Sequence, residues 1–261
     1  MQLDERLVVA RAVAREAGAL LRSSLGTHLA VRSKDVRANL VTQVDTQSEA
    51  LIRKRIGEAF AEDAVLGEES GQSAGDVEHR WIVDPLDGTT NYTHGYRCFC
   101  VSIAFERART VEFGVVYDPM ADELFEARLG GGATCNGATL QVSHRADLRD
   151  ALLCTGFPPY KGRSLATSLE IFAEFMHRSQ AIRRDGSAAL DLCYVAAGRF
   201  DGFWEGGLHA WDIAAGMLVV SEAGGATTDF AGGAATLDAG QIVASNGKIH
   251  EAMIETLRRH A

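Results

Sequence analysis

A chain of 261 residues, of which 46% are hydrophobic and 23% charged, can bury a large core as one compact unit or as two fused halves. The formal net charge of −9 argues against a broad nucleic-acid-binding surface, which is normally basic. No apolar stretch approaches the roughly 20 residues that span a bilayer, and residues 1–15 lack the pattern of a secretory signal. We therefore expect a cytoplasmic protein with no membrane association.

The five cysteines are expected to act as small buried hydrophobes. Their number is odd, and no Cys-x-x-Cys pair suggests zinc or a redox couple. Cys98 and Cys100 lie two residues apart on one face of a predicted strand, where they cannot easily bond to each other.

Two amphipathic helices are predicted at the start of the chain. Apolar residues recur at three- and four-residue steps between Leu3 and Leu21. The second helix begins at Thr42, with Asp45 three residues on, and its apolar face carries Leu51, Ile52, Ile56 and Phe60. The polar segment 32–39 between the two helices is predicted to form a flap.

Short apolar segments separated by turn residues predict strands between residues 65 and 142, at 81–83, 100–105, 111–117 and 124–125. We expect an antiparallel sheet backed by the two early helices. Beyond residue 150 strands alternate with helices: strands at 152–155, near 203–204 and at 241–244, and helices at 165–176, 187–197, 211–223 and from 250. Such alternation favours a layered α/β half. With no linker in sight, the halves 1–145 and 146–261 are expected to form one compact unit.

Two aspartates three residues apart, Asp84 and Asp87, follow the apolar segment 81–83, and Gly-Thr-Thr-Asn comes next. Carboxylates and a carbonyl that converge at one strand end suit a hard cation, and amides at the start of a helix suit a phosphate. Read alone, Asp-Pro-x-Asp-Gly is also a typical surface turn.

Two further acidic segments are ambiguous by themselves. Glu68 and Glu69 follow the apolar pair 65–66, where adjacent glutamates are usually a solvated pair. Asp212 begins an apolar helix, where it is typical of an N-cap.

Together and in this order, these segments resemble the inositol monophosphatase family, most closely its bacterial branch. The resemblance covers nearly the whole chain and rests on Asp45 and on the segments 67–69, 84–91, 186–192 and 211–216. It implies a layered αβαβα sandwich of the inositol monophosphatase or sugar phosphatase type, usually a homodimer. It also implies a magnesium-dependent, lithium-sensitive phosphomonoesterase that hydrolyses myo-inositol 1-phosphate and similar sugar or polyol monophosphates.

The resemblance further implies two to three Mg²⁺ ions per subunit. Glu68, Asp84 and the carbonyl of Leu86 would hold the first ion. Asp84 would bridge to a second ion that Asp87 and Asp212 also bind, and a third would lie near Glu68. A phosphate monoester is dianionic and repels a nucleophile, so two ions about 3.5–4 Å apart supply the positive charge that the reaction needs. Oxygen ligands without Cys or His match magnesium.

For the catalytic step, the resemblance implies that Thr89, with Asp45 behind it, orients and helps to deprotonate the attacking water. Glu68 is also counted among the catalytic residues, and the amides of Gly88 and Thr89 hold the phosphate. No covalent phosphoenzyme is required.

On the substrate side, Glu205 matches a residue that hydrogen-bonds the hydroxyls of the inositol ring; the alternative is an exposed acid at a strand end. Lys34 matches a flap lysine near the phosphate or the third ion, although a lone lysine is more often a solvated surface charge. The remaining substrate positions are Asp87, Gly88, Thr89, Gly186, Ser187, Ala188 and Asp212.

The sequence departs from the family pattern at two positions. Arg97 stands where a proline is frequent, and Asn39 where an aspartate is frequent. Neither residue is a proposed ligand, so the departures bear on the shape of the loops.

Other functions remain open. In relatives the same metal site serves fructose 1,6-bisphosphate, histidinol phosphate and nucleotide 3′-phosphate hydrolysis. A different class of function is also possible, because the bacterial branch includes a protein that binds the transcription machinery and acts in RNA metabolism. Arg183 and Arg184 fall where that relative carries basic residues, although they can equally pair with surface acids or a dimer partner.

Overall fold

A computed structural model of the chain describes residues 2–26, 31–33, 40–157 and 163–260. Its first part contains α1 (Gln2–Ser24), β1 (Val31–Ser33), β2 (Leu40–Thr42), α2 (Gln43–Ala59), β3 (Asp63–Gly67), β4 (Gly71–Gln72), β5 (Asp76–Asp87), α3 (Thr89–Thr93), β6 (Cys100–Arg107), β7 (Thr110–Asp118), β8 (Glu123–Arg128), β9 (Gly132–Cys135) and β10 (Ala138–Thr139). A short 3₁₀ helix, η1 (Leu148–Asp150), leads into β11 (Leu152–Thr155), α4 (Arg163–Arg178), β12 (Ala181–Arg183), α5 (Ala188–Ala196), β13 (Gly202–Gly206), α6 (Ala210–Glu222), β14 (Ala226–Thr228), β15 (Gln241–Ser245) and α7 (His250–Arg258).

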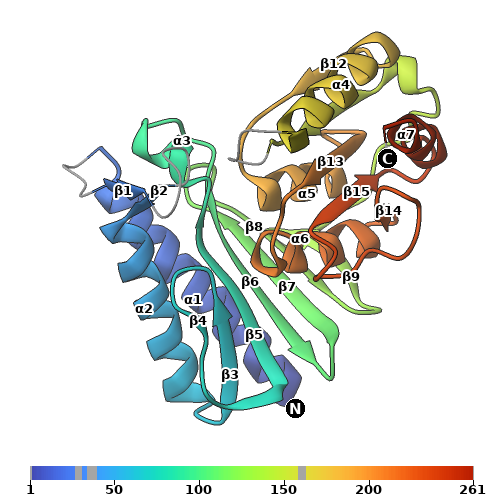
Figure 1. The fold of residues 1–261 in the computed structure, drawn as a ribbon. Helices are drawn as coiled ribbons and strands as arrows, with labels where there is room; N and C mark the ends of the chain where they lie inside the picture. Colours follow the sequence, from blue (N-terminus) through green and yellow to red (C-terminus); the bar gives the residue numbers. More distant parts are fainter. Residues whose placement is uncertain (1, 27–30, 34–39, 158–162, 261) are drawn as a thin grey trace.

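These elements build five alternating layers (Figure 1). Helices α1 and α2 lie side by side against one face of an eight-stranded sheet, and α6 packs on its other face. Beyond α5 and α6 comes a five-stranded sheet, and α4 and α7 cover its far side. The layered αβαβα architecture expected from the sequence is therefore confirmed.

The first sheet has the strand order β10-β9-β8-β7-β6-β5-β3-β4. The expectation of a purely antiparallel sheet is wrong at one place, because β3 and β5 are parallel. Residues 68–75 carry the chain back to the level of Asp63 before β5 begins, so that Asp63 pairs with Asp76. In the second sheet, of order β12-β11-β13-β15-β14, β11 is parallel to both its neighbours and β15 antiparallel to both of its own. The predicted division of the chain at residue 145 falls between β10 and β11 and remains a prediction.

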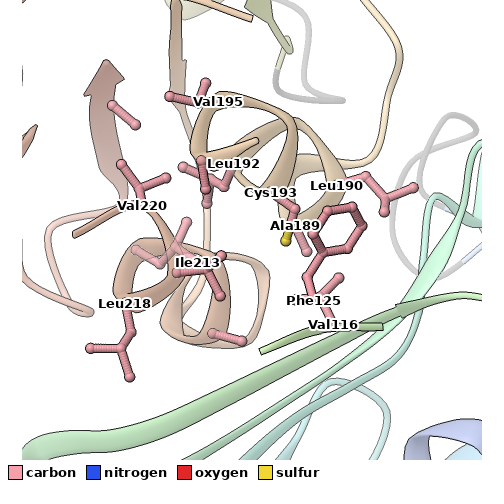
Figure 2. Packing of buried hydrophobic residues seen from close by; sticks show 14 of the residues in the cluster. Val116, Phe125, Ala189, Leu190, Leu192, Cys193, Val195, Ile213, Leu218 and Val220 are labelled. Atoms are coloured by element: carbon pink, nitrogen blue, oxygen red, sulfur yellow. The ribbon is translucent and has the colours of Figure 1, made fainter. Parts of the chain in front are cut away.

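Three hydrophobic clusters hold the layers together, and alternate strand residues feed different clusters. On β13, Phe203 faces α5 and α6, whereas Trp204 faces α4 and α7. Figure 2 shows the central cluster, in which side chains of α5 and α6 meet Val116 of β7 and Phe125 of β8. The close approach of α6 to the sheet requires Gly114, since a Cβ there would lie 2.6 Å from the Cα of Ala215.

The start of α2 follows the prediction. Thr42 is the N-cap, its hydroxyl accepts from the amide of Asp45, and the Asp45 carboxylate accepts from the amide of Thr42. No helix in the described part of the chain is long and apolar enough to cross a membrane.

A buried charged network ties α1 to the first sheet. The guanidinium of Arg6 donates two hydrogen bonds of 2.8 Å to the carboxylate of Asp63, and the indole of Trp81 donates to the same carboxylate at 2.9 Å. The side chains of Arg6 and Asp63 are only 9% and 5% exposed. Removing the acid therefore takes away the carboxylate that Arg6 and the indole N–H of Trp81 share in the interior.

We expect Asp63→Ala to lower the free energy of unfolding by about 3 kcal/mol. Urea unfolding followed by circular dichroism measures this change. Asp238→Ala is the matched control, because Asp238 pairs with Arg109 where both side chains are more than three-quarters exposed; its cost should stay below about 1 kcal/mol. An equal loss of unfolding free energy in the two variants would contradict the stabilising role of the buried network.

Candidate active site

The end of β5 brings Asp84 and Asp87 into one buried site. Opposite β6, the register shifts between them: Asp84 pairs with Ser102, and Asp87 pairs with Cys100. Three steps along β5 therefore match two steps along β6, which is a β-bulge. Residues three apart in a regular strand face opposite sides, and the extra residue in the bulge lets both carboxylates serve one site.

The bulge is stabilised locally. Asp84 Oδ1 accepts from the amide of Leu86 at 3.0 Å, and Ser48 of α2 donates to the carbonyl of Pro85 at 2.9 Å. Gly88 follows with φ +96°, and a Cβ there would lie 2.9 Å from the carbonyl oxygen of Cys98. Helix α3 begins directly after this glycine, as expected from the sequence.

Thr89 connects this site to α2. Its Oγ1 donates to Asp45 Oδ1 at 2.9 Å and lies 3.2 Å from the carbonyl oxygen of Leu86. Asp45 is fully buried, and its other oxygen accepts from Thr42. The helix cap and the contact with Thr89 thus fix both oxygens of one carboxylate.

Glu68 lies in the turn between β3 and β4, half-buried, and its amide donates to the carbonyl of Val83 at 3.3 Å. The turn is held from behind by Glu49, which accepts from the amides of Glu69 (2.7 Å) and Ser70 (3.1 Å). A Cβ at Gly67 would lie 2.6 Å from the Glu49 carboxylate, so only glycine allows this approach.

Glu49 was not identified from the sequence. Burial acts to raise the pKa of this carboxyl, but hydrogen bonds from Ser70, Glu69 and Arg53 outweigh it and lower the pKa. The available signal was its position: Glu49 lies four residues after Asp45, on the buried face of α2.

The second half of the chain supplies Asp212, in the first turn of α6. Asp212 is not the N-cap; His209 is, and Asp212 Oδ2 accepts from its amide at 2.6 Å. The carbonyl of the neighbouring Trp211 accepts from Ser102 of β6 at 3.4 Å, which joins the start of α6 to the first sheet.

Helix α5 also reaches the site. Ser187, its N-cap residue, donates from Oγ to Asp87 Oδ2 at 2.7 Å, and the amide of Ala189 donates to the same oxygen at 2.8 Å. Ser187 and Ala188 are buried. The side chain of Ser187 therefore serves Asp87 directly, a contact between residues 100 positions apart.

The carboxylates strongly influence one another. Burial raises the pKa of Asp84 well above its ordinary value, and the charges of Glu68, Asp87 and Asp212 raise it further. Burial, followed by the charge of Asp212, raises the pKa of Asp87 to about 7, against the hydrogen bonds from α5. Within the described ranges, neither Asp84 nor Asp87 forms a salt bridge with a lysine or arginine. The two buried carboxylates of Asp84 and Asp87, which have no cationic side chain as a partner in the part of the chain that the structure describes, fit a hard divalent cation.

Glu205 lies on β13 and is half-buried, so the alternative of an exposed strand-end acid is wrong. Its carboxylate lies against Gly156, where a Cβ would be 2.1 Å away; sequence reasoning offered no signal for this glycine. Burial, then the charge of Asp212, raises the pKa of Glu205 to about 8, while Arg184 acts in the opposite direction.

Asn91 bridges the two halves beside the site. Its Nδ2 donates to the carbonyls of Cys98 and Asp185, each at 2.7 Å, which positions Gly186. Gly186 has φ +86°, in the left-handed region that favours glycine.

The other residues singled out in the sequence lie outside the described ranges or on the surface. Lys34, Asn39 and most of the predicted flap lie outside the described residues. Arg97 is exposed in the connection between α3 and β6, and Arg183 and Arg184 are exposed at the end of β12.

The sequence matches the inositol monophosphatase family over residues 2–261. The chain belongs to this family, and membership supports a phosphatase. It is 47% identical over 223 residues to an inositol-1-monophosphatase of Rhizobium meliloti, covering 85% of this chain and 84% of the relative. It is 43% identical over 265 residues to Nus factor SuhB of Pseudomonas aeruginosa, covering 99% and 97% of the two chains.

The fold agrees with that of a solved protein of similar sequence. The crystal structure of the extragenic suppressor protein suhB from Bartonella henselae superposes with a TM-score of 0.94 at 41% identity, covering 98% of this chain and 99% of that one.

Proposed function

We propose that this protein is a magnesium-dependent phosphomonoesterase that hydrolyses myo-inositol 1-phosphate and similar sugar or polyol monophosphates. The observation that carries the proposal is the buried carboxylate group of Asp84 and Asp87, whose pKa values are raised by burial and by neighbouring acids. Such a group favours a bound cation, and the family to which the chain belongs is that of the inositol monophosphatases.

The proposed ligands are oxygen donors from three elements. Glu68, Asp84 and the carbonyl of Leu86 would hold one Mg²⁺. Asp84, Asp87 and Asp212 would hold a second, and a third would lie near Glu68. When bound, these ions supply the positive charge that a dianionic ester needs at both sides of phosphorus and lower the pKa of water.

The chain's own residues would position the nucleophile. The hydroxyl of Thr89 donates a hydrogen bond to Asp45. The lone pairs of its oxygen are therefore available to accept a hydrogen bond from an attacking water. Asp45 acts through Thr89 and is a positioning residue. The amides of Gly88 and Thr89, at the start of α3, are proposed to hold the phosphate.

We expect Thr89→Val to lower kcat on the order of 100-fold with little change in KM, because the variant keeps the shape but cannot accept from water. Steady-state kinetics on the ester that the wild type hydrolyses fastest measures kcat and KM separately. Thr89→Ser restores the hydroxyl and should recover most of the activity. A near-normal kcat for Thr89→Val would remove this residue from the proposed mechanism.

For the substrate, we propose that Glu205 binds ring hydroxyls. A carboxyl whose pKa is about 8 is largely protonated at neutral pH, so it both donates to and accepts from a hydroxyl. The other residues that we propose to bind the substrate are Asp87, Asp212 and the segment Gly186, Ser187 and Ala188. The Ser187 hydroxyl also donates to Asp87, so this side chain supports a proposed metal ligand as well. Lys34 is retained as a proposal from the family pattern alone.

Phosphate release tests the function. Myo-inositol 1-phosphate is compared with fructose 1,6-bisphosphate, histidinol phosphate and 3′-phosphoadenosine 5′-phosphate, with and without Mg²⁺. Preferred turnover of the inositol ester supports the proposal. Preference for another ester keeps the reaction and changes the substrate. A folded, magnesium-binding protein that releases phosphate from none of them overturns the proposal.

A second candidate is a role in transcription or RNA metabolism. It is favoured by 43% identity to a protein named as a Nus factor and by the exposed pair Arg183 and Arg184. Co-purification with RNA polymerase that is lost in Arg183→Ala/Arg184→Ala, but kept in Asp84→Asn, supports this role. Absence of co-purification removes it.

Three further properties are proposed. A homodimer and inhibition by lithium are proposed from the family resemblance, and a cytoplasmic location from the sequence pattern. Sedimentation analysis, cell fractionation and titration of the phosphatase with Li⁺ test them in turn.

A further inference from the structure

A second group of metal-ligating side chains lies outside the proposed magnesium ligands. It consists of Cys154 on β11, Asp185 just after β12, and Asp191 in the first turn of α5. One ligand atom of each residue lies within 4.8 Å of those of the other two. We refer to these three residues as the Cys154 group.

Asp191 is the unusual member of the group. It is completely buried, and neither carboxylate oxygen has a hydrogen-bond partner in the part of the chain that the structure describes. Burial raises its pKa well above the ordinary value; the nearby Cys154 thiol opposes the shift, and the charges of Glu205 and Asp185 add to it. A buried polar group without a partner is costly and rare in folded proteins, so it points to a missing ligand.

The fold holds the three side chains in place. Strands β11 and β12 are parallel, with Cys154 paired to Arg183, so Cys154 and Asp185 lie near the same ends of neighbouring strands. The backbone carbonyl of Asp185 accepts from Asn91 at 2.7 Å. Helix α5, which carries Asp191, is buried between the sheets. The three side chains therefore come from a strand, a helix and a connection whose backbone is held by Asn91.

We propose that the Cys154 group binds one Zn²⁺ ion, at a site separate from the magnesium ligands. A thiolate with two carboxylates suits zinc, whereas magnesium prefers oxygen ligands alone. Zinc–ligand distances of about 2.0–2.3 Å place tetrahedral donors about 3.3–3.8 Å apart, so donors within 4.8 Å need to move by roughly 1 Å. Binding releases the thiol proton and the proton of Asp191 to solvent, gives the Asp191 carboxylate its counter-charge and leaves a fourth position for water.

The site would act structurally on the neighbouring pocket. Asp185 directly precedes Gly186 and Ser187, and Ser187 donates to Asp87. An ion on Asp185 would therefore fix the segment from which α5 supports a proposed magnesium ligand.

Cobalt is the probe, because Zn²⁺ is spectroscopically silent and Co²⁺ bound to a thiolate shows a charge-transfer band in the near ultraviolet. The whole protein is titrated with Co²⁺ in excess Mg²⁺ and a non-thiol reductant, followed by displacement with Zn²⁺. We expect one equivalent to give the band and Zn²⁺ to abolish it. We also expect Zn²⁺ to raise the Tm of the protein.

Four variants test whether the band comes from the Cys154 group, and not from another cysteine or from the proposed magnesium ligands. Cys154→Ala should abolish the band, and Asp191→Asn should weaken binding at least about tenfold. Cys193→Ala is the matched control, because Cys193 is another fully buried cysteine of the central cluster and lies outside the Cys154 group. It should retain the band, and so should Asp84→Asn.

The proposal is overturned if the wild type shows no band, if Cys154→Ala keeps it, or if Asp84→Asn loses it. If no ion binds and Asp191→Asn raises the Tm, Asp191 is simply a neutral buried acid. That outcome also overturns the zinc site.

Discussion

Replacing Asp84 by asparagine is expected to reduce phosphate release on the order of 10³-fold or more and to raise the Tm of the metal-free protein. Asp84 is 2% exposed, and the charges of Glu68, Asp87 and Asp212 oppose its ionisation. Asparagine keeps the shape and the acceptor for the amide of Leu86, but removes one buried charge. The same change therefore weakens the proposed metal site and relieves repulsion when no metal is bound.

Enzyme assays with Mg²⁺ and thermal unfolding with EDTA measure the two effects. Each kcal/mol gained corresponds to about 2–4 °C for a chain of this size. Asp118→Asn is the control, because Asp118 is also buried, burial raises its pKa, and its Oδ1 accepts from the amides of Met120 and Ala121. The control should keep its activity. Full activity in Asp84→Asn would exclude Asp84 as a metal ligand.

The stability of the metal-free protein is expected to depend on pH through Asp87. Its pKa rises from 3.8 to about 7 on folding, because burial and Asp212 disfavour the charged form. The folded state therefore binds this proton more tightly than the unfolded state. The resulting stabilisation is complete below pH 4 and is lost as the pH rises to about 7, by at most about 4 kcal/mol.

The measurement compares wild type with Asp87→Asn, which carries no charge at any pH. In EDTA, the unfolding free energy of the wild type relative to the variant should fall between pH 4 and pH 7 and then level off. Saturating Mg²⁺ should reduce this fall, because a cation replaces the proton as counter-charge. A difference that stays constant across this range would show that Asp87 does not titrate as proposed.

The sequence predicted those helices and strands whose ends are set by residues close by in the chain. The capping pair Thr42 and Asp45 placed the start of α2, and glycine at position 88 placed the start of α3. Strands such as β11, predicted at 152–155, were found with those bounds. Very short strands, such as β10 and β14, were not predicted, because two or three residues carry no readable period and pair only where neighbours are present.

The candidate site likewise has features that local sequence indicates and features that depend on residues distant in the chain. The sequence indicated which carboxylates belong together, because their segments resemble one family in a fixed order. It did not reveal Glu49 behind the Gly67 turn, Gly156 beside Glu205, or the dependence of Asp87 on Ser187. These contacts join residues distant in the chain, and no local pattern encodes them.

The amino-acid sequence by itself thus determined the family, the layered fold and the residue types of the proposed metal site, since these depend on local patterns and their order. Only the tertiary structure decided the parallel pairing of β3 with β5 and the bulge that turns Asp84 and Asp87 to one site. It also decided the burial of Asp191, whose carboxylate oxygens have no hydrogen-bond partner among the described residues, and this distinguishes a second candidate site from an ordinary helix acid. Burial, register and the pKa of a carboxyl depend on neighbours that only folding assembles.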